Sequence, residues 1–154
     1  MFCPLCQSDA KPAFEIKAFR LLDCTACGHR FAGIDADENH VAAQYDDSYF
    51  NGGGAGYDDY FAEAEMLRSR GRMYADKVAS FTKPGKILDV GAAAGYILKG
   101  FSDKDWIGKG VEPNASMAEF GRSSLGIDLT QGSLESFDTE ELFDMVSMIQ
   151  VAAK

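Results

Sequence analysis

The sequence predicts an α/β protein in which a small cysteine-rich module precedes a doubly wound parallel sheet. Two observations predict this fold class. All four cysteines lie within the first 27 of the 154 residues. From residue 86 onward, short apolar stretches alternate with helical patterns, which is typical of β-α-β units. The length leaves room for one ordinary domain, or for a small module plus part of a larger domain.

The cysteines form two pairs, Cys3-Pro-Leu-Cys6 and Cys24-Thr-Ala-Cys27, with 17 residues between the pairs. This spacing is typical of a four-cysteine zinc site, because a two-residue gap lets both thiolates of a pair point at one centre. Two disulfides or four unrelated thiols are the alternatives, but disulfides need an oxidising compartment, which no feature of the sequence indicates. We therefore expect a structural zinc site with no open coordination position, formed by Cys3, Cys6, Cys24 and Cys27.

Residues 1–34 are expected to form a zinc ribbon, with short strands at 14–16 and 19–22. A module of this size cannot bury enough apolar surface to fold without metal. Residues 35–57 are interpreted as a linker and flap, because an acidic stretch is followed by a glycine run flanked by aromatic residues. Composition leaves open whether this segment is a mobile flap or a simple flexible linker.

The third segment, 58–154, is expected to begin with a helix over residues 58–81. Its apolar residues recur at alternating spacings of three and four, which predicts one buried stripe. The stripe consists of Tyr60, Ala64, Leu67, Gly71, Tyr74, Val78 and Phe81. Arg68, Arg70 and Arg72 mostly lie off this stripe, so we interpret them as a solvated face.

The remaining pattern predicts strands at 86–90, 106–111, 127–130 and 142–149, and helices from residue 96 and over 114–125. The small residues of the Gly91–Gly95 turn let backbone approach a ligand at a helix N-terminus, where free N–H groups and the helix dipole favour anionic or polar groups. Glu112 ends the second strand, 21 residues after Gly91. That is the position of a carboxylate that accepts hydrogen bonds from the ribose of an adenosine cofactor. The glycine fingerprint of nicotinamide cofactors fails at Ala93 and Tyr96.

Residues 87–96, 110–114, 132–134 and 143–149 together resemble four motifs of the class I S-adenosylmethionine-dependent methyltransferases. The cysteine pairs, followed by Tyr-x3-Tyr-Phe, resemble a subgroup with an N-terminal zinc ribbon. The resemblance implies a partial Rossmann-like sheet of about four strands, S-adenosylmethionine as cofactor and a small-molecule methyl acceptor. The implied cofactor-binding residues are Tyr45, Tyr49, Asp89, Gly91, Ala92, Gly95, Glu112, Pro113, Ser133 and Leu134.

Within that set, the resemblance implies Gly91 and Gly95 near the methionine portion and Glu112 on the ribose. Ser133 and Leu134 would lie near adenine, and Asp89 would orient the turn and face the cofactor's amino group through water. Tyr45, Tyr49 and Tyr57 are weaker candidates that would line the pocket from the flap. Ala93 replaces the family's middle glycine, a small change that permits binding.

A complete domain of this family has about seven strands, whereas this sequence ends just past the fourth. We therefore expect an incomplete domain that binds cofactor without turnover, and no catalytic base is nominated. The alternative is a non-catalytic zinc-ribbon module that binds a nucleotide or a protein.

The expected partners follow from charge and hydropathy. The net charge is −9, with +1 in residues 1–34 and −10 in the remainder, which argues against nucleic acid. No apolar run approaches the roughly 20 residues of a membrane span, and no signal region opens the sequence, so a cytoplasmic location is expected. The family's strand order, 3-2-1-4, would leave 143–149 as an apolar edge, which predicts a homodimer or another partner there.

Overall fold

The structure is a computed structural model that describes residues 1–34, 47–52, 58–149 and 151. The chain divides into two compact units, Met1–Glu38 and Asn39–Ala153. Within the described ranges, no helix combines the length and the apolar character that a membrane crossing requires.

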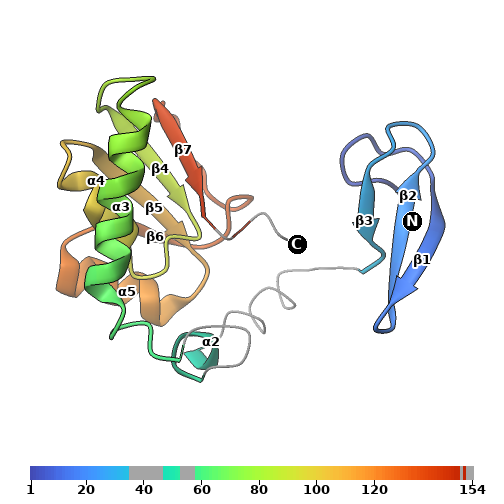
Figure 1. The fold of residues 1–154 in the computed structure, drawn as a ribbon, viewed down its shortest axis with the longest axis horizontal. Helices are drawn as coiled ribbons and strands as arrows, with labels where there is room; N and C mark the ends of the chain where they lie inside the picture. The colour runs from blue at the N-terminus through green and yellow to red at the C-terminus, as the bar shows by residue number, and fades with distance from the viewer. Residues whose placement is uncertain (35–46, 53–57, 150, 152–154) are drawn as a thin grey trace. The chain divides into compact units, whose positions relative to one another are not determined.

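The first unit is a three-stranded antiparallel sheet of β1 (Ala10–Ile16), β2 (Phe19–Cys24) and β3 (Arg30–Ala32) (Figure 1). The strands expected at 14–16 and 19–22 are therefore present, and each extends further. Lys17 and Ala18 both have positive φ, the conformation that a two-residue hairpin turn requires. The buried apolar side chains of this unit are few: Cys3, Leu22 and Cys24. So small a core cannot hold three strands together by apolar burial alone.

The second unit contains a four-stranded parallel sheet in the order β6-β5-β4-β7, which confirms the expected 3-2-1-4 arrangement (Figure 1). The strands are β4 (Lys86–Val90), β5 (Ile107–Glu112), β6 (Asp128–Gln131) and β7 (Met145–Met148). The α/β fold class and the doubly wound sheet order predicted from the sequence are thus confirmed.

The fourth strand is shorter than the expected 142–149. Asp144 exchanges hydrogen bonds with Lys86 at the start of β4, donating its N–H to the Lys86 carbonyl and accepting the Lys86 N–H on its carboxylate. Pairing therefore begins only at Met145, and Leu142 is 87% exposed. In the described part of the chain, β4 is the only strand beside β7, which leaves Val146 and Met148 half exposed at the sheet edge.

In the described part of the second unit, the helices beside the sheet are α2 (Asp47–Asn51), α3 (Ala64–Val78), α4 (Tyr96–Ser102) and α5 (Ala115–Leu125). The helix expected over 58–81 is shorter at both ends. Before it, the Asp59 carboxylate accepts the N–H groups of Phe61 and Ala62, which forms a turn that competes with helix. After it, Phe81 is 88% exposed, so its expected place on the buried stripe is wrong.

Helices α3 and α4 touch through two glycines. A Cβ on Gly71 would overlap the Ile97 carbonyl oxygen, and one on Gly100 would overlap the Arg68 carbonyl oxygen. Only glycine permits backbones to approach this closely. The contact brings α3 against the helix that follows β4.

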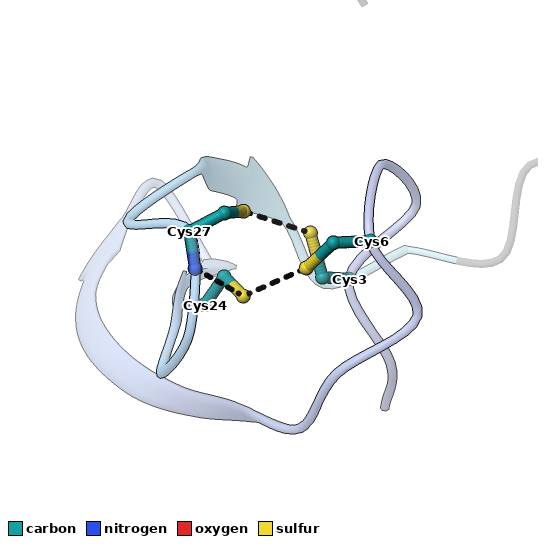
Figure 2. Close-up of side chains that lie close together, drawn as sticks. All are labelled: Cys3, Cys6, Cys24 and Cys27. Atoms are coloured by element: carbon teal, nitrogen blue, oxygen red, sulfur yellow. Dashed lines mark hydrogen bonds between the residues drawn. The ribbon is translucent and has the colours of Figure 1, made fainter.

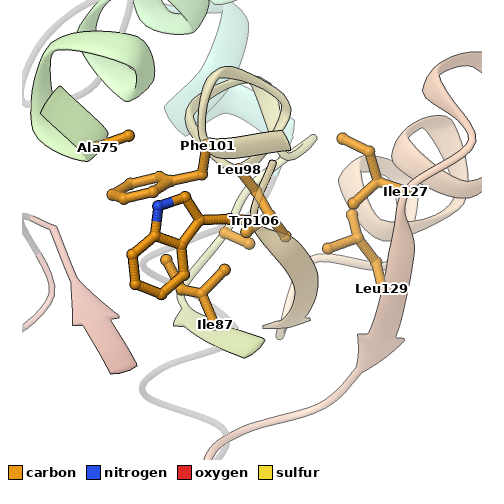
Figure 3. Packing of buried hydrophobic residues seen from close by; sticks show 8 residues of the cluster. Ala75, Ile87, Leu98, Phe101, Trp106, Ile127 and Leu129 are labelled. Carbon is orange, nitrogen blue, oxygen red and sulfur yellow. The ribbon is translucent and has the colours of Figure 1, made fainter. Parts of the chain in front are cut away.

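The core of the second unit lies between these helices and one face of the sheet. It joins Ile87 of β4 and Leu98 and Phe101 of α4 to Trp106, Ile127 and Leu129 (Figure 3). The rings of Phe101 and Trp106 meet edge to face, with centroids 5.9 Å apart at 88°. Because side chains alternate along a strand, Asp89 shares the helix-facing side with Ile87. The packing of β4 therefore fixes the position of this buried acid.

Candidate functional site

The turn that connects β4 to α4 has an unusual backbone. Gly91, Ala93 and Gly95 have φ angles of +70°, +49° and +85°. Alternating left-handed residues fold the turn tightly at the carboxyl end of the sheet, where open α/β proteins bind ligands. Ala93 is the residue of the three that carries a Cβ penalty in this conformation.

The N–H groups of this turn are used within the chain. Gly91 and Ala92 both donate to the Val111 carbonyl, at 2.9 and 3.2 Å, and Gly95 donates to the Ala92 carbonyl at 2.8 Å. The N–H of Ala93 donates to Glu112 Oε2 at 2.7 Å. These four N–H groups are therefore already hydrogen-bonded within the protein. Residues of β5 accept three of them, and the Ala92 carbonyl within the turn accepts the fourth, from Gly95.

Glu112 ends β5 beside the turn and is 3% exposed; it is not among the described residues that line the cavity beside Asp89. Oε2 accepts the Ala93 N–H, and Oε1 accepts the N–H of Asn114 at 2.8 Å. Burial raises the pKa of Glu112, and the two backbone N–H groups partly oppose that rise. A carboxylate has about four acceptor positions, so each oxygen keeps a lone pair for a ligand hydroxyl.

Asp89 lies on β4, beside Ser147 of β7. The Ser147 hydroxyl donates to Asp89 Oδ1 at 2.6 Å. Burial raises the pKa of Asp89 to about 6; the Ser147 hydrogen bond opposes this, and the charge of Glu112 adds to it. Asp89 thus titrates just below neutral pH, and near pH 7 it presents a buried negative charge.

A cavity of about 110 Å³ opens beside Asp89 and the turn. Gly91 and Ala92 line it from the turn, and Arg70 and Tyr74 line it from α3. The arginines of α3 therefore have two kinds of surroundings. Arg68 and Arg72 bind the Asp103 carboxylate at 2.7 and 3.1 Å, as expected of a solvated face, whereas Arg70 lies at the cavity.

Sequence reasoning missed Arg70. The available signal was its spacing of four residues from Tyr74, which places both on the same side of a helix. Arg70 is exposed, and the apolar stripe alone could not show that this side of the helix also borders a cavity.

The other predicted cofactor residues have different places. Gly95 begins α4, and Pro113 follows Glu112 directly. Ser133 and Leu134 follow Gly132, whose N–H donates to the Glu112 carbonyl at 2.9 Å. This hydrogen bond places the start of their segment next to the end of β5. None of these four is among the described residues that line the cavity.

Of the two flap tyrosines predicted to bind cofactor, Tyr49 lies among the described residues and Tyr45 does not. Tyr49, on α2, packs beside Phe50 against the cluster that includes Tyr60 and Tyr96. It is not among the described residues of the cavity wall. Tyr45, like Tyr57, lies outside the described residues.

In the first unit, the structure brings the four predicted cysteines together (Figure 2). All four Sγ atoms lie within 4.8 Å of one another, with 3.7 Å between Cys3 and Cys27 and 3.4 Å between Cys6 and Cys24. Four sulfurs on a tetrahedral Zn²⁺ with bonds of about 2.3 Å lie roughly 3.8 Å apart. All four cysteines are free of disulfides, and two backbone N–H groups point at Cys24 Sγ. The donor set fits a four-sulfur metal site.

Comparison with known proteins finds similarity among solved structures alone. No protein-family profile matches the chain, and no curated protein matches it. The glycopeptide N-methyltransferase MtfA complexed with sinefungin has 22% identity and a TM-score of 0.45 over 53% of this chain. The amino pentose methyltransferase CalS10 from Micromonospora echinaspora has 20% identity and a TM-score of 0.48 over 76% of this chain.

A third structure, the Burkholderia thailandensis 1,6-didemethyltoxoflavin-N1-methyltransferase, has 18% identity and a TM-score of 0.47 over 89% of this chain. The chain spans 35% of MtfA, 43% of CalS10 and 57% of this third protein. With TM-scores below 0.5 and identities of 22% or less, these similarities carry no inference about the activity, cofactor or substrate of this chain.

Proposed function

We propose that the second unit binds S-adenosylmethionine at the carboxyl end of its sheet and that the protein is a methyltransferase. The observation that carries this proposal is the position of Glu112. This buried residue lies at the end of β5, and its carboxylate accepts a hydrogen bond from the Ala93 N–H of the turn. Each of its two oxygens can accept a further hydrogen bond. A pair of adjacent hydroxyls, such as those of a ribose, is the group that such a carboxylate recognises.

The charges of the cavity support an amino-acid group beside that ribose. Asp89 supplies a buried acid and Arg70 supplies a guanidinium at the same cavity. An α-amino acid carries an ammonium and a carboxylate on one carbon, so Asp89 would bind the first and Arg70 the second. Ser133 and Leu134 would contact adenine from the end of β6.

The hydrogen bonds of the turn disfavour a dinucleotide. Pyrophosphate binding at a glycine-rich turn depends on backbone N–H groups that point at the ligand. In this protein, the N–H groups of Gly91, Ala92, Ala93 and Gly95 donate within the chain. A phosphate placed there would also lie close to the buried carboxylates of Asp89 and Glu112. The turn therefore suits a cationic cofactor better than an anionic one.

When bound, S-adenosylmethionine would supply an electrophilic methyl group on its sulfonium. The contribution of this chain is placement: Glu112 fixes the ribose, and Asp89 and Arg70 fix the amino-acid end. We propose a small molecule as the methyl acceptor. No residue of the described chain is assigned as a general base.

We further propose that Cys3, Cys6, Cys24 and Cys27 hold a structural Zn²⁺. Four protein thiolates complete a tetrahedron, which leaves no position for a substrate or water. The small core of the first unit would then be stabilised mainly by the metal.

The exposed edge of β7 supports a homodimer in which two such edges meet, because an open apolar edge readily pairs with another strand. Sedimentation of the full chain at high micromolar concentration tests this proposal. A dimer is expected, and a clean monomer would contradict it.

Equilibrium dialysis against radiolabelled S-adenosylmethionine tests the cofactor assignment. We expect saturable binding that unlabelled S-adenosylhomocysteine displaces and that NAD does not. Absence of binding, or displacement by NAD at equal concentration, would overturn the assignment.

A further inference from the structure

Asn114 connects the proposed ribose carboxylate to a distant part of the chain. Its backbone N–H donates to Glu112 Oε1 at 2.8 Å, and its side-chain oxygen accepts the N–H of Met117 at 2.9 Å, which caps α5. Its side-chain nitrogen donates to Asp47 Oδ1 on α2 at 3.1 Å, across 67 residues of sequence. A single residue, 8% exposed, therefore contacts the site, a helix end and α2.

We propose that Asp47 is a positioning residue for the cofactor site and acts on Glu112 through Asn114. This proposal rests on the proposed function, since it takes Glu112 as the ribose ligand. A carboxylate can only accept hydrogen bonds, so Asp47 requires the amide nitrogen of Asn114 to face α2. The amide oxygen then faces the N–H of Met117, and the Asn114 backbone is held where it donates to Glu112.

Two further observations support a fixed position for Asp47. Phe50, on the same short helix, is 2% exposed and packs edge to face with Tyr60, with ring centroids 5.5 Å apart. The other carboxylate oxygen of Asp47 accepts the Ser116 hydroxyl at 3.4 Å, in the first turn of α5. A negative charge is stabilised at that end of a helix. Helix α2 is thus anchored by an aromatic side chain, and its carboxylate lies at the start of α5.

Asp47 helps to hold the Glu112 carboxylate in one orientation. The carboxylate of Glu112 must be held in one orientation to present its remaining lone pairs to two hydroxyls. The Ala93 N–H fixes one oxygen, and the Asn114 N–H fixes the other. Without Asp47, the Asn114 side chain loses a partner in a buried position and the turn that carries its N–H loosens.

The test is a double-mutant cycle in the full chain, read by calorimetric titration with S-adenosylhomocysteine. We expect Asp47→Ala to weaken binding about tenfold in the wild-type background and to have almost no effect in an Asn114→Ala background. Asp47→Asn keeps an acceptor oxygen and should retain most of the affinity. The matched control is Ser116→Ala, which removes the longer Asp47 contact and should change affinity little.

A second measurement needs no ligand. The exchange rate of the Asn114 backbone N–H in the free protein reports the hydrogen bond to Glu112, and we expect Asp47→Ala to speed it about tenfold. Unchanged exchange, or an equal affinity loss in both backgrounds, would overturn the positioning role of Asp47. If wild-type protein fails to bind S-adenosylhomocysteine while Asp47→Ala still speeds exchange, the proposed function falls and the structural coupling stands.

Discussion

The backbone N–H of Ala93 donates to the carboxylate of Glu112 at 2.7 Å, which ties the turn after β4 to the end of β5. Ala93 has a φ of +49°, a conformation that costs a residue with a Cβ roughly 1 kcal/mol. The hydrogen bond to a buried carboxylate offsets this cost. The same contact that forms the proposed ribose site therefore also fixes the shape of the turn.

Replacement of Glu112 by Gln is expected to destabilise the second unit. A carboxylate accepts the N–H groups of both Ala93 and Asn114, but a carboxamide has one acceptor oxygen and would set its NH2 against the other donor. We expect a loss of about 1–3 kcal/mol in the free energy of unfolding, measured by urea denaturation at pH 7. Glu119→Gln is the control, because its exposed pair with Arg122 contributes at most about 1 kcal/mol. Equal stability of the two variants would contradict the role of Glu112.

Arg70→Ala is expected to weaken binding of S-adenosylhomocysteine about tenfold without changing stability, because the lost contact is with the ligand's carboxylate. Arg68→Ala is the matched control. It removes the solvent-screened ion pair with Asp103, so stability should change little while affinity is unchanged.

The same variant gives a sharper test with 5′-methylthioadenosine, which lacks the amino-acid group. Arg70→Ala should bind this probe as the wild type does. An equal loss of affinity for S-adenosylhomocysteine and 5′-methylthioadenosine would show that Arg70 does not contact the amino-acid group of the ligand.

Asp89 predicts opposite pH dependences for stability and binding. Its pKa is raised by burial from 3.8 to about 6, so between these values the folded chain holds a proton that the unfolded chain has released. The contribution of Asp89 to the free energy of unfolding is therefore fully present below about pH 4. It is lost as the pH rises through 6, and the loss amounts to at most roughly 3 kcal/mol. Cofactor affinity should rise over the same interval, because the ligand's ammonium needs the ionised acid.

The control for this prediction is Asp89→Asn, which keeps an acceptor for the Ser147 hydroxyl. Urea denaturation from pH 4 to 7 should show the wild type losing stability relative to this variant. Calorimetry should show a smaller rise of affinity with pH in the variant than in the wild type, since the raised pKa of Glu112 is common to both proteins. A constant stability difference between the two proteins would contradict the buried titration of Asp89.

The first unit is expected to contain about one zinc per chain and to unfold when the metal is removed. Metal content by atomic absorption tests the first expectation. Amide exchange within Ala10–Ile16 and Phe19–Cys24, before and after chelation, tests the second. Cys24→Ser should behave as the chelated protein does. A metal-free chain with protected strands would refute the zinc site.

The parts of the fold that follow from local sequence could be predicted. The spacing of Cys3, Cys6, Cys24 and Cys27 brings four sulfurs together because each pair turns on its own two-residue gap. The strand that ends in Val90 and the capping of α5 by Asn114 likewise depend on neighbouring residues. Glu112 was found because parallel strands align their carboxyl ends.

The parts that depend on contacts across the sequence could not be predicted. Arg70 reaches the cavity only because Gly71 lets α3 approach α4. Val111 and Glu112 accept the N–H groups of Gly91, Ala92 and Ala93, and this depends on the register of the strands, which no local pattern encodes. The contact between Asp47 and Asn114 joins segments whose spacing carries no signal.

The central claim is that Glu112 marks an S-adenosylmethionine site, and calorimetric titration with S-adenosylhomocysteine tests it most directly. The wild-type chain should bind one equivalent with a dissociation constant on the order of micromolar, and Glu112→Gln should bind at least about tenfold more weakly. Glu119→Gln should match the wild type. No binding by the wild type, or equal affinity in Glu112→Gln, would contradict the claim.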